Sequence, residues 1–193
     1  MNIVEADSDR LLAAMRTLLA RKGIATPAEI AERIAITDAA SPALGARMVA
    51  RAWLDPAFRA LMLADGTSAA ESLGIVMRGA PPLGVAECTP EVHALVVCTL
   101  CSCYPRAVLG YPPYWYKSAA YRARAVREPR GLLAEFGTVL PEGTRIRVID
   151  STADYRWMVL PQRPHGTENW SEAELARLVH AGDMIGVTIP TVA

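Results

Sequence analysis

Three cysteines are crowded into one segment of six residues, Cys98-Thr99-Leu100-Cys101-Ser102-Cys103. Cysteine thiolates are soft ligands that bind transition-metal ions. Sulfurs this close together suit one shared ligand better than structural disulfides, which need a defined geometry between two positions. We therefore expect Cys98, Cys101 and Cys103 to bind a single metal ion, and we call residues 98–103 the claw loop.

The backbone of the claw loop can supply further ligands. Only Ser102 separates Cys101 from Cys103, so a metal ion bound by both sulfurs lies against the main chain between them. The amide nitrogens of Ser102 and Cys103 can then bind the same ion, which makes five ligands from six residues. With two nitrogens and two sulfurs in one plane and Cys98 on the axis, another octahedral position stays open, as metal-ion catalysis requires.

The residues alone leave other interpretations of these cysteines open. A Cys-x-x-Cys pair can be redox-active or form half of a zinc site, and three buried cysteines can be inert core residues. The chain could then be a non-catalytic thiol module that binds zinc or senses oxidants. Structural zinc usually takes four side-chain ligands, and none of the remaining candidates has the paired spacing of a zinc finger: Cys88, His93, His165 and His180.

Composition excludes some classes of protein. The chain has 193 residues, of which 52% are hydrophobic, and can bury a sizeable core. Its 20 basic and 20 acidic side chains leave no broad basic face for a nucleic acid. No apolar run approaches the roughly 18 to 20 residues of a membrane-spanning helix, and the N-terminus does not resemble a secretory signal. We therefore expect a soluble, cytoplasmic protein without a nucleic-acid or membrane partner.

The first third of the sequence is predicted to be helical. A helix that starts at Asp7 or Ser8 and ends near Gly23 carries one apolar stripe, which comprises Leu11, Leu12, Met15, Leu18 and Leu19. If exposed, this stripe could bind another subunit. Further helix starts are expected at Thr26-Pro27-Ala28-Glu29, Ser41-Pro42, Asp55-Pro56 and Ser68-Ala69-Ala70-Glu71.

A change in residue pattern near position 80 suggests two regions. Gly79-Ala80-Pro81-Pro82-Leu83-Gly84 cannot continue a helix, and β-branched residues become common after it. We expect an α+β fold, with a helical, partner-embracing region at 1–79 and a mixed α/β domain with the claw loop at 80–193. In the second region, strands are predicted at 85–87, 94–97, 145–149, 155–160 and 185–189. Helices are predicted after Pro113, near Pro129 and from Ser171, where Glu174 completes a capping box.

The segment Val97-Cys98-Thr99-Leu100-Cys101-Ser102-Cys103 closely resembles the signature of the nitrile hydratase α-subunit family, which the γ subunit of thiocyanate hydrolase shares. The likeness covers most of the chain after residue 80. It continues through Thr89-Pro90-Glu91-Val92-His93, Trp115-Tyr116-Lys117, Tyr121-Arg122-Ala123-Arg124, Arg127-Glu128-Pro129-Arg130, Met158-Val159-Leu160-Pro161 and Gly166-Thr167-Glu168.

The resemblance implies a particular cofactor and oxidised ligands. Thr99 is typical of the cobalt branch of the family, so one non-corrin Co(III) ion per chain is expected rather than Fe(III). Cys101 would be oxidised to a sulfinate and Cys103 to a sulfenate, while Cys98 stays a thiolate. Cys101 and Cys103 would then be the catalytic residues in the hydration of a nitrile to an amide.

The resemblance also implies a partner. In this family a β subunit, sometimes split into two chains, covers the cleft and supplies arginines to the anionic sulfur oxygens. The chain alone is then expected to be inactive, and a cobalt-loading chaperone is a further expected partner. The alternative within the family is hydrolysis of thiocyanate by the same metal site.

The sequence departs from the family pattern just after the claw loop. The family usually continues Tyr-Pro-Trp-Pro, whereas Tyr104-Pro105-Arg106-Ala107 stands here, so that Arg106 replaces a pocket tryptophan. With Arg106, Tyr111 and Tyr114 as substrate-pocket residues, we expect a bulky nitrile that forms hydrogen bonds. Arg106 could instead pair with a β-subunit carboxylate. Cys88 is expected to be structural, and the arginine-rich run at 122–130 to brace the claw loop and the partner interface.

Overall fold

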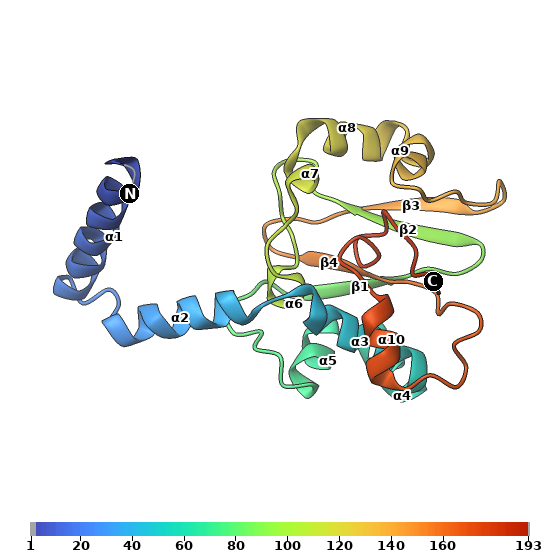
Figure 1. The fold of residues 1–193 in the computed structure, drawn as a ribbon, viewed down its shortest axis with the longest axis horizontal. Coiled ribbons are helices and arrows are strands. Elements are labelled where there is room, and N and C mark those ends of the chain that lie inside the picture. The colour runs from blue at the N-terminus through green and yellow to red at the C-terminus, as the bar shows by residue number, and fades with distance from the viewer. Residues whose placement is uncertain (1–2, 193) are drawn as a thin grey trace. The chain divides into compact units, whose positions relative to one another are not determined.

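The computed structural model describes the backbone of residues 3–192 and the side chains of residues 7–192. The chain forms two compact units, Met1–Ala39 and Ala40–Ala193. The first unit contains two helices, α1 (Ile3–Arg21) and α2 (Pro27–Ala39) (Figure 1). Helix α1 begins before the predicted start at Asp7 or Ser8, which is therefore wrong.

The start of α2 follows the sequence closely. The backbone N–H of Thr26 donates to Glu29 Oε2 at 2.7 Å, and the backbone N–H of Glu29 donates to Thr26 Oγ1 at 3.2 Å. These reciprocal bonds satisfy two of the N–H groups that a helix start leaves without partners. The expected helix start at Thr26-Pro27 is confirmed.

Three helices open the second unit: α3 (Pro42–Leu54), α4 (Pro56–Ala64) and α5 (Gly66–Ser72). The first two start at the prolines that the sequence indicated. Helix α5 does not start at Ser68, because the Asp65 carboxylate accepts hydrogen bonds from the backbone N–H groups of Thr67 and Ser68 and caps the helix earlier.

Four strands form two parallel pairs. Strand β1 (Leu83–Glu87) pairs with β4 (Arg156–Leu160), and β2 (Val92–Val97) pairs with β3 (Arg145–Asp150). Four of the five predicted strands are therefore confirmed, with small shifts at their ends. In the second pair, Val97 lies opposite Asp150, so the chain enters the claw loop directly beside the end of β3.

The fifth predicted strand, at 185–189, is wrong. Residues 181–188 form successive turns, in which the Gly182 carbonyl accepts hydrogen bonds from the N–H groups of residues 185 to 188. The carbonyl of Met184 also accepts from Val159 of β4, and that of Ile185 from Val96 of β2, each at 2.8 Å. The C-terminal turns thus connect the two strand pairs.

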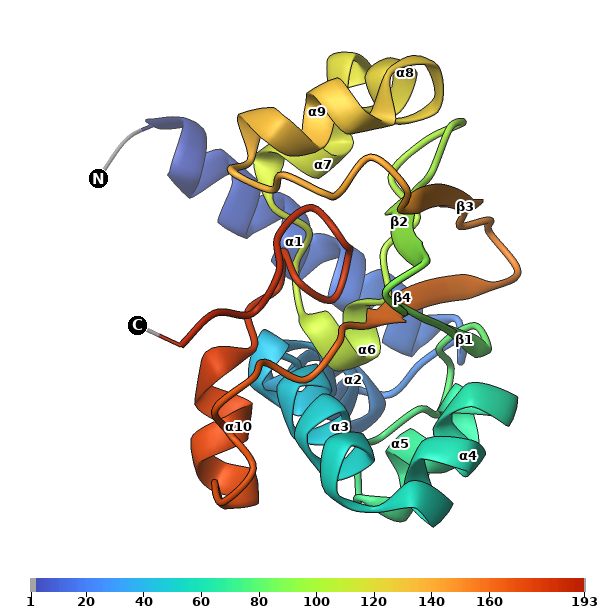
Figure 2. The same ribbon diagram turned by 90° about the vertical axis from the view of Figure 1, so that its right-hand side faces the viewer.

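Helices lie alongside both strand pairs (Figures 1 and 2). Helices α7 (Tyr114–Lys117), α8 (Ala119–Arg127) and α9 (Pro129–Glu135) lie beside β2 and β3. Helices α3, α4, α5 and α10 (Glu172–Leu178) lie beside β1 and β4, and the short α6 (Arg106–Leu109) follows the claw loop. The predicted capping box at Ser171 and Glu174 is present.

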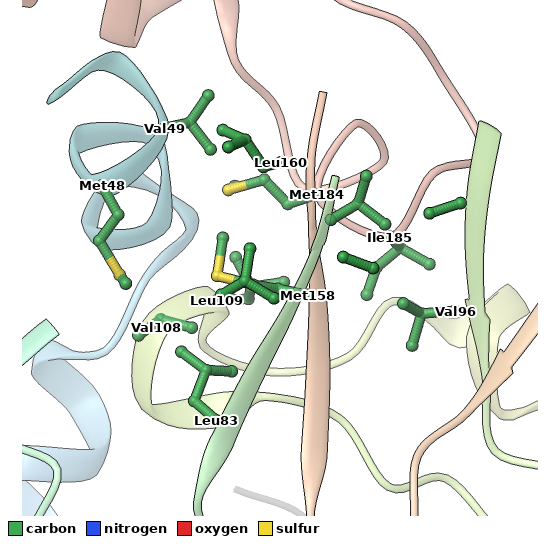
Figure 3. Packing of buried hydrophobic residues seen from close by; sticks show 14 of the residues in the cluster. Met48, Val49, Leu83, Val96, Val108, Leu109, Met158, Leu160, Met184 and Ile185 are labelled. Carbon is green, nitrogen blue, oxygen red and sulfur yellow. The ribbon is translucent and has the colours of Figure 1, made fainter. Parts of the chain in front are cut away.

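One hydrophobic core joins residues from both sides of position 80 (Figure 3). Met48 and Val49 of α3 are fully buried in the same cluster as Leu109, Met158 and Met184. The change in pattern near residue 80 falls between α5 and β1, inside the second compact unit. The architecture is α+β, as expected. In the described part of the chain no helix is both long and apolar enough to cross a membrane.

Candidate metal centre

The three cysteine sulfurs of the claw loop converge on one point. Their Sγ atoms all lie within 4.8 Å of one another, with 3.3 Å between Cys98 and Cys101 and 3.1 Å between Cys101 and Cys103. All three cysteines are free. Because the sulfurs are well beyond the roughly 2.05 Å of a disulfide bond and close to one another, they fit a single soft metal ion.

The cysteines differ in exposure. Cys98 and Cys103 are buried and Cys101 is exposed. An ion bound by all three sulfurs would therefore be held from the protein side and remain open toward the surface of this chain.

The claw loop also shifts the pKa values of two thiols, Cys101 and Cys103, in opposite directions. Hydrogen bonds from Cys103 and Cys98, with smaller contributions from the backbone N–H groups of Ser102 and Cys103, lower the pKa of Cys101 to about 7. Burial, followed by the interaction with Cys101, raises the pKa of Cys103 to about 12. Cys101 is therefore the first thiolate to form, while Cys103 needs a bound cation to lose its proton at neutral pH.

The start of the claw loop is fixed to the end of β3. The Asp150 carboxylate accepts a hydrogen bond from the backbone N–H of Thr99 at 3.0 Å and another from the Thr99 hydroxyl at 2.5 Å. Both bonds follow from the parallel register, which places Asp150 opposite Val97. A single side chain thus fixes the residue that follows Cys98.

Helices α7 and α8 hold the rest of the loop. Arg122 donates to the carbonyl of Cys101 at 2.6 Å, and Tyr116 donates to the carbonyl of Cys103 at 2.8 Å. Tyr121 donates to the carbonyl of Val96, at the end of β2, at 2.6 Å. The expectation that the arginine-rich run braces the claw loop is confirmed for Arg122.

Two other arginines of that run, Arg124 and Arg130, have different partners. Arg124 pairs with the carboxylates of Glu128 and Glu135, and Arg130 donates to the backbone carbonyls of Leu140, Pro141 and Thr144. These bonds support α8 and α9, so only part of the run acts on the claw loop directly.

Comparison with known proteins places this arrangement in a family. The model of the family "Nitrile hydratase, alpha chain" matches residues 6–188. The chain belongs to the nitrile hydratase alpha-chain family. The match includes residues of α1 and all of α2, so the likeness to the family is not limited to the segment after residue 80.

Several members of the nitrile hydratase family are closely similar. The low-molecular weight cobalt-containing nitrile hydratase subunit alpha of Rhodococcus rhodochrous is 50% identical, over 92% of this chain and 86% of its own. A recombinant thiocyanate hydrolase with partially modified cobalt centres has a TM-score of 0.86 and 40% identity, with coverage of 96% and 90%. A double mutant of the Fe-type nitrile hydratase of Comamonas testosteroni Ni1 has a TM-score of 0.82 and 43% identity, with coverage of 96% and 91%.

Arg156 is a residue near the claw loop that the sequence did not reveal. Its positive charge acts on Cys103 and lowers the pKa of that thiol, against the larger effect of burial. Its Nη1 atom is buried and has no hydrogen-bond partner among residues 7–192. Arg156 begins β4, far from Cys103 in sequence, and no local pattern indicates that the fold brings the two together.

The residues expected to line a substrate pocket of the nitrile hydratase type lie on α6 and around α7. The Arg106 guanidinium stacks over the Tyr111 ring at 4.5 Å, so the structure brings these two together. Tyr114 begins α7 and is 89% exposed. All three belong to the segment that follows the claw loop, and their role in substrate binding stays a prediction.

Cys88 lies apart from the three cysteines of the claw loop. Its thiol is buried, accepts a hydrogen bond from the backbone N–H of Ala94 at 3.3 Å and lies 3.8 Å from His93 Nδ1. Burial raises the pKa of Cys88 to about 11, so this thiol is neutral at physiological pH. In the described part of the chain, the claw cysteines form the only group of three or more histidine, cysteine or carboxylate side chains that could hold a metal ion.

Proposed function

We propose that the chain is the α subunit of a cobalt-dependent nitrile hydratase, which adds water to a nitrile and forms the amide. The observation that carries the proposal is the convergence of three free cysteine sulfurs within 4.8 Å at the end of β2. The cobalt-containing relative at 50% identity supports cobalt over zinc or no metal. An Fe-type nitrile hydratase is also similar in structure, so structural similarity alone does not choose the metal. Thr99 and the cobalt-containing relative together favour cobalt over iron.

The proposed ligands are the sulfurs of Cys98, Cys101 and Cys103 and the backbone nitrogens of Ser102 and Cys103. The backbone N–H groups of these last two residues lower the pKa of the Cys101 thiol, which supports a position beside the converging sulfurs. A bound Co(III) ion would supply Lewis acidity at its open coordination position. The exposure of Cys101 supports an open position toward the surface.

The claw cysteines would carry the reaction as a sulfinate at Cys101 and a sulfenate at Cys103. The sulfenate oxygen of Cys103 would attack the nitrile carbon or accept a proton from the attacking water. Arg156 is close enough to Cys103 to act on its charge, and we propose that it stabilises this oxygen together with arginines of a β subunit. Addition of one water to the nitrile accounts for every atom of the amide.

A β subunit, as one chain or two, would complete the substrate pocket. Tyr111 and Tyr114 are 64% and 89% exposed on this chain, which supports a pocket that is closed only by a partner. With Arg106 beside Tyr111, we propose a bulky or polar nitrile as the substrate, bound by stacking on tyrosine and by hydrogen bonds to the guanidinium.

Loading and location complete the proposal. The free cysteines are typical of a protein kept in a reducing compartment, which supports the cytoplasm as its location. Because two of the ligands are buried, we propose that a chaperone delivers the cobalt ion.

Thiocyanate hydrolysis is a second candidate, and Arg106 is the observation that favours it. An exposed guanidinium close in sequence to the claw loop would attract a small anion. The similarity to a thiocyanate hydrolase with cobalt centres supports this alternative.

The test is co-expression with the product of the adjacent gene in cobalt-containing medium. We expect a complex with one cobalt per claw, an intact mass that includes three added oxygen atoms, and release of amide from nitriles. Cys103→Ser should abolish the activity, and Cys88→Ser should leave cobalt content unchanged. Release of ammonia from thiocyanate without hydration of nitriles would favour the second candidate, and a complex that contains zinc or no metal would contradict both.

A further inference from the structure

The peptide between Cys101 and Ser102 carries a charged hydrogen bond that the proposed chemistry does not use. Arg122 of α8 donates from Nη1 to the carbonyl oxygen of Cys101 at 2.6 Å. This oxygen and the amide nitrogen of Ser102 belong to the same peptide unit. We propose that Arg122 is a positioning residue that aims the Ser102 nitrogen at the metal ion.

The first step of the argument is geometrical. A trans peptide unit is planar, so a bond that fixes the direction of its carbonyl oxygen also fixes the direction of its N–H, which points the opposite way within the same plane. Without Arg122, the Cys101–Ser102 peptide could rotate about the bonds that flank it. With Arg122 in place, the Ser102 nitrogen stays on the side where it already interacts with the Cys101 sulfur.

The second step is electrostatic. A backbone nitrogen that binds a metal ion in place of its proton leaves negative charge on the peptide, and part of that charge lies on the carbonyl oxygen. A guanidinium at 2.6 Å from this oxygen stabilises such charge more than a neutral donor does. The type of side chain thus fits the peptide that it contacts.

The third step compares the other anchors of the claw loop. Asp150 binds Thr99, and Tyr116 binds the carbonyl of Cys103, whose peptide leads to Tyr104 rather than to a ligand nitrogen. Among the side-chain hydrogen bonds that reach the loop from other elements within residues 7–192, only that of Arg122 meets a peptide that supplies a proposed ligand. Arg122 is therefore distinguished from residues that merely hold the loop in place.

The inference rests on the proposed function, because it takes the Ser102 nitrogen as a ligand. The experiment uses the complex with its partner chain, loaded with cobalt, and compares Arg122→Gln and Arg122→Lys with the wild type. Arg177→Gln is the matched control, since it removes the same charge from an exposed helical position outside the arginine-rich run, on α10. The readouts are cobalt content, the rate of cobalt loss to a chelator, the sulfur-to-cobalt absorption band, and kcat and KM.

We expect Arg122→Gln to increase the rate of cobalt loss by roughly 10- to 100-fold, the effect usual for residues that orient metal ligands, and to lower kcat. The absorption band should shift, KM should change little, and Arg122→Lys should lie between Gln and the wild type. Arg177→Gln should match the wild type in all readouts. Wild-type cobalt retention and absorption in Arg122→Gln would overturn the inference.

Folding of each variant is checked by its thermal midpoint and by co-elution with the partner. If Arg122→Gln does not assemble, Arg122→Lys decides, because it keeps the charge but cannot place a nitrogen at the same point: unchanged cobalt retention would then overturn the inference. Failure of the proposed function has a different signature. A wild-type complex that binds cobalt but hydrates no nitrile contradicts the activity, while the chelator and absorption measurements still test Arg122.

Discussion

At the scale of single residues, the fold gives three of the cysteines different exposure and different thiol pKa values. Cys101 is exposed and has a pKa lowered to about 7, while Cys103 is buried and has a pKa raised to about 12. Cys88 is buried, with a pKa of about 11, and lies outside the claw loop. The reactivity of the metal-free chain should therefore separate these thiols.

Alkylation of the metal-free chain by iodoacetamide should start at Cys101. Because the thiolate is the reactive form, its rate should rise as pH increases through about 7 and level off above it. Cys103 and Cys88 should react far more slowly at pH 8. Peptide mass spectrometry after timed alkylation measures each site, and faster labelling of Cys103 than of Cys101 would contradict the expectation.

Replacement of Arg106 tests the basis of substrate choice. Arg106→Trp removes the cation above Tyr111 and adds a broad apolar ring, so we expect kcat/KM to fall by roughly tenfold or more for bulky polar nitriles relative to small aliphatic ones. Steady-state kinetics on a pair of nitriles of different size measures the ratio. Unchanged relative kinetics would show that Arg106 does not govern substrate size, and Arg177→Gln serves as a control for loss of charge.

Much of the metal site could be predicted at this scale. Three cysteines within six residues suggest a shared ligand, because one tight turn suffices to bring their sulfurs together, and the claw loop makes such a turn. Arg156 could not be predicted, since only the position of β4 brings it near Cys103. Tertiary neighbours of this kind leave no trace in local spacing.

At the scale of elements, the helix starts at Pro42, Pro56 and Ser171 were predicted correctly, whereas the strand predicted at 185–189 was not. Pro42, Pro56 and the Ser171 capping box give correct starts because their effects are local. The β-branched residues at 185–189 indicated a strand, but the Gly182 carbonyl and the Asp183 side chain hold this segment in turns. Hydrogen bonds within the segment therefore decide its conformation.

The turn at Gly186 should be intolerant of any side chain. Its φ is +85°, and a Cβ atom there would overlap the carbonyl oxygen of Ala94 in β2. Gly137 has a similar φ of +84° but no heavy atom within 4 Å of such a Cβ. Gly137→Ala should then cost about 1 to 2 kcal/mol of unfolding free energy for the left-handed backbone alone.

Gly186→Ala should cost more than Gly137→Ala, on the order of 3 kcal/mol or above, since β2 or the turn must also move. Denaturant unfolding of both variants, compared with the wild type, measures the difference. Equal losses at the two positions would show that the overlap with Ala94 is relieved without cost.

At the scale of the whole molecule, the first unit exposes an apolar surface. Leu11, Leu12, Met15 and Leu18 of α1 are each about half exposed or more, and α2 has no buried residue. An apolar stripe of this size is typical of a surface that binds another protein. We therefore expect it to bind the partner chain.

A charge placed in this stripe should weaken assembly. Met15→Glu should reduce co-purification of the partner by roughly tenfold or more, because a carboxylate would lose its water in the interface. Ala13→Glu, which puts the same charge on the opposite side of α1, is the matched control. Size-exclusion chromatography of the co-expressed chains measures the outcome, and equal assembly of the two variants would contradict a role for the stripe.

The C-terminal turns that connect β2 and β4 determine when the metal site can form. Val96, just before the claw loop, has its N–H bound by Ile185, and β2 itself pairs with β3, so the strand that leads into Cys98 depends on segments made much later on the ribosome. During translation the cysteines therefore emerge before the scaffold that orients them exists. If the cysteines bind metal as proposed, we expect the ion to enter after the C-terminal turns have been made, and a nascent chain stalled before residue 181 would present the three thiols without a formed site.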